Sequence, residues 1–217
     1  MALTQRPGRF RRRGRWSSSV FLSLDFEGSH VDPQRGCPTQ LGIALMNDEG
    51  DVHVSDEWLC APPRHYKTDR VTREVDAYAL QVAGLRVEDL DAGLDPWQSC
   101  RRLSEFVAAN RGSSLRVVTF NVAYDIAMYR NMLFFASDWH PTEKGIRVAH
   151  PEILGPNWTC AYGMARAVVP FLDSHKLDDV AAHFGLSRSG EAHGALEDAI
   201  LAGRVFCRMR KPLAVAA

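Results

Sequence analysis

The sequence predicts an α/β or α+β domain in which helices pack on a sheet. Residues 19–60 contain three apolar segments with strand character, separated by turn residues, and this pattern favours an antiparallel meander. The remaining chain alternates segments of helical period with short, buried strand-like segments, which is typical of a sheet covered by helices. A length of 217 residues with 46% apolar residues fits one domain of ordinary size with its own core.

The meander comes from three segments of similar length. Ser19 to Phe26 is apolar and contains β-branched and aromatic residues, as expected for a buried strand. Gln40 to Met46 predicts a second strand and Val52 to Cys60 a third, because the latter alternates apolar and polar residues. The turn between them is formed by Asn47–Gly50, whose residue types favour a hairpin.

Helices and one strand are expected in the middle of the chain. The spacing of apolar residues predicts helices over Asp69–Ala83 and Pro96–Asn110. Leu115–Phe120 reads as a short buried strand, and Tyr124–Phe135 as a helix that follows it. Residues 136–157 contain prolines and glycines without a period and are interpreted as a long loop.

The C-terminal part predicts three further units. Trp158–Val168 is expected to begin as a short strand and to continue as a helix. Asp173 or Ser174 is the expected cap of the next helix, which ends at Gly185. The last helix is expected over Gly194–Met209.

The cysteine content and the length of the apolar runs indicate which cellular compartment to expect for the protein. The five cysteines are far apart and form no paired motif, which argues for reduced thiols and against a disulfide framework or a zinc site. No apolar run approaches the roughly 20 residues of a membrane helix, and no secretory signal is recognisable. We therefore expect a cytoplasmic protein with no membrane association.

The charge of the chain is unevenly distributed. The net charge is zero, yet residues 1–16 contain six arginines and no acid, so the remainder carries about six net negative charges. We expect residues 1–16 to be a disordered basic tail and residues 17–211 to form the domain. The tail is either a means of holding a polyanion near the domain or simply a soluble leader.

Asp25 and Glu27 form the first candidate site. They lie two residues apart near the end of the first strand, so both side chains point to one face of the sheet. Burying unpaired carboxylates is costly, so the alternatives are a functional pair and a water-exposed pair on an edge strand. Carboxylates are the ligands that Mg²⁺ and Mn²⁺ prefer, and two such ions can assist phosphodiester hydrolysis.

Three further residues gain meaning only together with that pair. Asp125 follows the fourth predicted strand, where an acid also serves a helix N-terminus. Asp198 lies in the first part of the last helix, beside its apolar stripe. His193 stands before this helix, where it could accept a proton from water or act only as a cap or surface residue.

Taken in order, these patches resemble the DEDD exonuclease superfamily in its histidine subclass (DEDDh). This group contains the proofreading subunit of DNA polymerase III and ribonuclease T-type enzymes. The first motif, Asp-x-Glu on a strand, is matched by LDFEG. The second is matched by residues 120–125, FNVAYD, and the third by residues 193–199, HGALEDA. The resemblance spans roughly residues 18–210.

The resemblance implies a ribonuclease H-like fold, with a five-stranded mixed sheet of three antiparallel and two parallel strands flanked by helices. It also implies a 3′–5′ exonuclease that releases nucleoside 5′-monophosphates with two divalent cations, Mg²⁺ or Mn²⁺. The metal ligands would be Asp25, Glu27, Asp125 and Asp198. His193 would be the general base.

Substrate contacts are implied for Phe26, Gly28, Ser29 and Asn121, and the substrate would be a single-stranded 3′ end of DNA or RNA. Three features depart from the family pattern: Gly28-Ser29 replaces the usual threonine run, Phe120 replaces the usual histidine, and the segment from Asp125 to Trp158 is longer than in compact members. Two alternatives remain open. One is a catalytically silent nucleic-acid-binding module, for instance a polymerase or replisome partner, and the other is a nuclease for dinucleotides or short oligonucleotides. The sequence does not indicate the oligomeric state.

Overall fold

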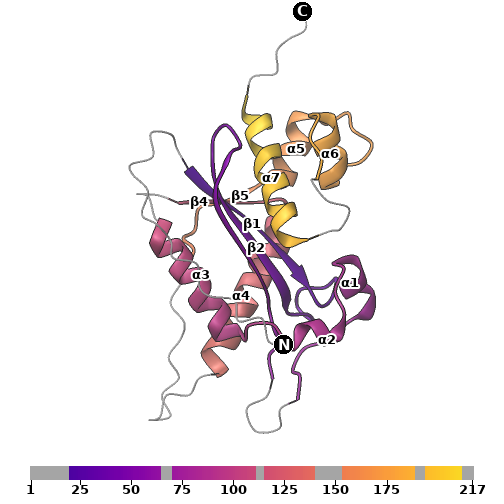
Figure 1. Ribbon diagram of the computed structural model, residues 1–217. Helices are drawn as coiled ribbons and strands as arrows, with labels where there is room; N and C mark the ends of the chain where they lie inside the picture. Colours follow the sequence, from indigo (N-terminus) through magenta and orange to yellow (C-terminus); the bar gives the residue numbers. More distant parts are fainter. Residues whose placement is uncertain (1–19, 65–69, 111–114, 140–152, 189–193, 212–217) are drawn as a thin grey trace, which may run out of the picture.

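The computed structural model describes residues 20–64, 70–110, 115–139, 153–188 and 194–211. Its elements, in chain order, are β1 (Val20–Gly28), β2 (Pro38–Asn47), β3 (Val52–Leu59), α1 (Ala77–Val82), α2 (Val87–Leu90), α3 (Pro96–Asn110), β4 (Arg116–Thr119), α4 (Val122–Trp139), β5 (Trp158–Cys160), α5 (Ala161–Val168), α6 (Leu177–His183) and α7 (Ala195–Arg210). The strands form one sheet in the order β3-β2-β1-β4-β5. Helix α7 lies on one side of this sheet, and α3 and α4 lie on the other (Figure 1). β1 pairs antiparallel with β2, as β2 does with β3, whereas β1–β4 and β4–β5 are parallel. The predicted five-stranded mixed sheet flanked by helices is confirmed.

Strict alternation along β1 divides the core between the two faces of the sheet. Leu22, Leu24 and Phe26 pack into a cluster with residues of α3 and α4. Phe21 faces the opposite way and joins a second cluster with α5, α6 and α7. Since side chains alternate along a strand, Ser23, Asp25 and Glu27 share the face of Phe21. The residues of the Asp-x-Glu motif are thereby directed toward the side covered by α7.

The helix expected over Asp69–Ala83 is much shorter in the structure. Only Ala77–Val82 is helical, and the Asp76 side chain caps it by accepting a hydrogen bond from the Tyr78 amide. The preceding backbone bonds elsewhere, since the Thr72 amide donates to Pro63 and the Asp76 amide donates to Ser29. These bonds to distant segments outcompete the helical period, and the expectation was wrong for the described residues 70–76.

Other boundaries also differ from expectation. β1 extends through Gly28, because pairing with β2 continues past Phe26 across a register shift. α4 runs to Trp139, so the first residues of the expected loop 136–157 are helical. Lys176 occupies the N-cap of α6, whereas the Ser174 hydroxyl donates to Asp179 within that helix. α2 was not predicted, because four residues are too few to show a helical period.

All five cysteines are free. Within the described parts of the chain, no helix is both long and apolar enough to cross a bilayer.

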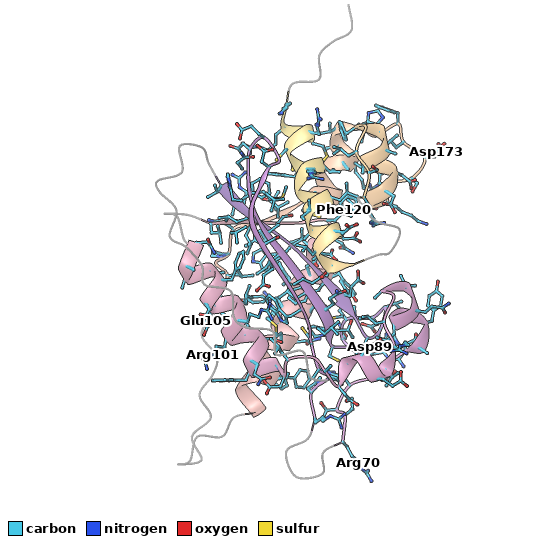
Figure 2. The ribbon with its side chains drawn as sticks, in the orientation of Figure 1. Arg70, Asp89, Arg101, Glu105, Phe120 and Asp173 are labelled. Carbon is cyan, nitrogen blue, oxygen red and sulfur yellow. The ribbon has the colours of Figure 1, made fainter. Side chains whose placement is uncertain are left out.

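On the outer face of α3, Arg101 and Glu105 form an exposed pair directed away from the sheet (Figure 2). The strands and the helices of both faces therefore form three layers, with the polar residues of α3 toward solvent.

Candidate metal centre

Asp25, Glu27 and Asp198 form a compact carboxylate cluster. One carboxylate oxygen of each residue lies within 4.8 Å of one from each of the other two, and all three residues are only partly exposed. Asp25 and Glu27 come from β1, and Asp198 comes from the first turn of α7. The structure thus brings together three of the four predicted metal ligands, although Asp198 lies 171 positions after Glu27 in the chain.

The close seating of α7 on the sheet places Asp198 over these strands. A side chain at Gly42 would collide with the backbone of Ala195 and Leu196, and one at Gly203 would collide with Met46. Between these two contacts, the Ser23 hydroxyl donates a 2.6 Å hydrogen bond to the Ala199 carbonyl. Small residues therefore let the helix approach the backbone of the sheet along its length.

Asp125 lies next to this cluster but is not one of its three members. It sits in the first turn of α4, and its side chain is only 1% exposed. Its Oδ1 accepts a 3.1 Å hydrogen bond from the Phe26 amide. β1 pairs with β4 only over Phe21–Ser23, and the Phe26 amide lies beyond this stretch. The Asp125 side chain therefore accepts its hydrogen bond in place of a neighbouring strand.

Burial and mutual repulsion raise the pKa values of three of these carboxylates. Burial, followed by the charges of Asp125, Glu27 and Asp198, raises the pKa of Asp25 well above its ordinary range. Burial and the charge of Asp198 raise the pKa of Glu27 to about 7. Burial raises the pKa of Asp125 to about 7, although the Phe26 amide opposes this shift. A cluster of this kind gains stability from cations placed among its oxygens.

Arg188 supplies one positive charge to the cluster. Its Nε donates to Oδ1 of Asp198 at 2.6 Å and its Nη2 donates to Oδ2 at 3.0 Å, and its Nη1 reaches Asp178 on α6. The guanidinium also lowers the pKa of Asp25 and Glu27. Arg188 was not among the predicted site residues, because an arginine in a polar stretch between two helices has no motif that distinguishes it.

The four residues predicted to contact the substrate differ in how far they are buried. The Phe26 side chain is buried in the core on the face of α3 and α4. The Ser29 hydroxyl is also buried and donates to the Glu74 carbonyl at 2.6 Å. Gly28 lies against the Tyr124 ring, so that any side chain there would collide with the tyrosine hydroxyl.

Asn121 is exposed immediately before α4, and its carbonyl accepts from the amides of Tyr124 and Asp125. Among these four positions, Asn121 alone is exposed. His193 falls within residues 189–193, outside the described part of the chain.

The chain matches no protein-family model and no curated protein sequence. Its fold is nevertheless similar to several solved nucleases. The nuclease domain of 3′hExo, a DEDDh family member bound to rAMP, superposes with a TM-score of 0.65 at 13% identity, over 89% of this chain and 92% of that domain. A 3′-exonuclease that recognises the 3′ end of a histone mRNA stem-loop gives a TM-score of 0.64 at 12% identity, over 90% of this chain and 83% of the other.

Exonuclease I of E. coli, in a zinc-bound complex with single-stranded DNA, gives a TM-score of 0.63 at 17% identity. The superposition covers 89% of this chain but only 40% of exonuclease I, so this chain corresponds to less than half of that enzyme. At these identities the similarity establishes the fold. The chain has the ribonuclease H-like fold of the DEDDh 3′-exonucleases, as the sequence motifs predicted.

Proposed function

We propose that the protein is a metal-dependent 3′–5′ exonuclease that hydrolyses the terminal phosphodiester bond of single-stranded DNA or RNA and releases nucleoside 5′-monophosphates. The carboxylate cluster of Asp25, Glu27 and Asp198 is the observation that carries this proposal. It lies on a fold shared with DEDDh exonucleases, at the positions where the sequence motifs match.

The donor set suits hard divalent cations such as Mg²⁺ or Mn²⁺. These ions prefer oxygen ligands, and among the described residues the cluster consists of carboxylates alone. Asp25, Glu27 and Asp198 would hold the cations, and Asp125 would contribute a fourth carboxylate from α4. A pair of such ions activates the attacking water and stabilises the leaving oxygen.

Three other residues have proposed roles in proton transfer and substrate binding. His193 would accept the proton of the attacking water on an imidazole nitrogen, since its ordinary pKa lies near neutrality. Asn121, which is exposed and whose carbonyl accepts a hydrogen bond from the Asp125 amide, would contact the terminal nucleotide. The buried Ser29 would act on the substrate through the shape of the loop that it braces.

A direct test uses 3′-labelled oligonucleotides of DNA and RNA, together with a dinucleotide, in the presence of Mg²⁺ or Mn²⁺. We expect mononucleotides from the wild type, none from Asp198→Ala, and near-normal release from Glu197→Ala, an acid in the same helical turn but outside the cluster. His193→Ala should lower turnover by about 10² while metal binding persists. Binding of 3′ ends without release of nucleotides by the wild type would refute the proposal and support the silent module instead.

A further inference from the structure

The face of the sheet that carries the metal ligands continues across two more strands. In the antiparallel register, Asp25 is paired with Gly42 on β2, and Gly42 is paired with Glu57 on β3. Glu27 is likewise paired with Gln40. Directly paired residues project to the same face, so Gln40 and Glu57 stand in the same rows as the two carboxylates of β1.

The first turn of α7 lies across these rows, and its amides need acceptors. Its N-cap is Gly194, which has no side chain to accept a hydrogen bond. The Leu196 amide donates instead to Oε1 of Glu57 at 2.9 Å. The Ala195 amide points at Oε1 of Gln40 at 3.4 Å. The helix therefore receives its capping acceptors from the sheet, across more than 130 residues of sequence.

Gly42 explains why this arrangement is possible. Any side chain at this position would overlap the backbone of Ala195 and Leu196, so the helix rests directly on the strand between Asp25 and Glu57. Two residues later the same turn supplies Asp198 to the cluster. The position of Asp198 relative to Asp25 and Glu27 thus depends on where the first turn of α7 is anchored.

We propose that Glu57 is a positioning residue for the metal centre, and that Gln40 assists it. Glu57 does not belong to the carboxylate cluster, and it acts by fixing the first turn of α7 and thereby the Asp198 carboxylate. Because the inference concerns the metal centre, it rests on the proposed function. Its geometric part, the capping of α7 from β3, does not depend on metal.

The experiment compares wild type with Glu57→Ala, Glu57→Gln and a control, Asp95→Ala. Glutamine retains an acceptor oxygen at the same place, whereas alanine removes it. Asp95 caps α3 through a 2.8 Å bond from the Gln98 amide, the same kind of bond on a helix that supplies no ligand. Amide hydrogen exchange of the first turn of α7 in EDTA and calorimetric titration with MnCl₂ provide two readouts, and kcat and KM on an oligonucleotide provide a third.

We expect faster exchange over residues 195–198 in Glu57→Ala, with Mn²⁺ affinity reduced about 10-fold, as is common when a residue that orients a ligand is removed. The change should appear in kcat more than in KM. Glu57→Gln should return the exchange rate and the Mn²⁺ affinity to near wild type. Asp95→Ala should leave Mn²⁺ affinity unchanged.

Four outcomes count against the inference. Wild-type Mn²⁺ affinity in Glu57→Ala would overturn it, and so would an equal loss in Asp95→Ala, which would indicate general destabilisation. An equal loss in Glu57→Gln would overturn the hydrogen-bond argument, because charge would then be the cause. If the wild type itself binds no Mn²⁺ and releases no nucleotides, the proposed function fails and the positioning role fails with it, whereas the exchange readout still tests the capping alone.

Discussion

Replacing Arg188 should destabilise the protein in a way that depends on metal. Arg188 forms a two-pronged ion pair with Asp198, and both side chains are only 12% exposed. Removing one partner of a buried ion pair costs about 3–5 kcal/mol, because the other charge remains buried. Asp198 would then face Asp25 and Glu27 without a counter-charge, so we expect Arg188→Met to lose about 3 kcal/mol of unfolding free energy in EDTA.

Saturating Mn²⁺ should remove most of this loss. Cations within the cluster would supply the positive charge that the guanidinium provided, which leaves only the exposed contact with Asp178 to lose. We expect a residual cost of about 1 kcal/mol or less. By linkage, the difference of about 2 kcal/mol corresponds to about 30-fold tighter Mn²⁺ binding by the variant.

Urea denaturation at pH 8, with EDTA or with Mn²⁺, measures both values, and calorimetry checks the affinity. The control is Arg102→Met, because Arg102 forms a similar two-pronged pair with Asp56 on β3, outside the cluster. Its cost should be the same in both buffers. If Arg188→Met loses equal stability with and without Mn²⁺, the reasoning that a cation and the guanidinium compensate the same carboxylate is wrong.

Three other predictions address pH, packing and the tail. Because the pKa of Glu27 is about 7 in the folded metal-free protein and 4.5 ordinarily, the folded state retains a proton that the unfolded state has released. Stability in EDTA should therefore fall as pH rises from about 5 to about 8, and urea midpoints of Glu27→Gln should show a flatter profile. Gly42→Ala should lower the unfolding free energy by about 1–3 kcal/mol in thermal or urea melts, because its methyl group would collide with the backbone of Ala195 and Leu196; an unchanged melt would contradict the close seating of α7. Deleting residues 1–16 should weaken polynucleotide binding and reduce its salt dependence, measured by fluorescence anisotropy over a salt series, if the arginines contact phosphate.

The parts of the structure that follow from local pattern could be predicted from the sequence. Alternation along β1 correctly placed Asp25 and Glu27 on one face, because the period of a strand is two. The apolar stripe of the last helix gave its bounds to within one residue. In contrast, the stretch before Asp76 pairs with segments around Pro63 and Ser29, and no local pattern contains that information. Predictions failed where distant partners, and not residue propensity, determined the backbone.

The same distinction explains why the carboxylates could be named while the residues that hold them in place could not. A metal ligand must have a particular chemistry, so its residue type and spacing leave a motif. Glu57 needs only to offer an oxygen at one point, and that point is set by the register Asp25–Gly42–Glu57 and by the seating of α7. Several residue types satisfy such a requirement, and none forms a motif with the ligands. Shifting β3 by one residue would turn Glu57 to the opposite face. The alignment of three strands therefore determines which side chain can anchor the helix that carries Asp198.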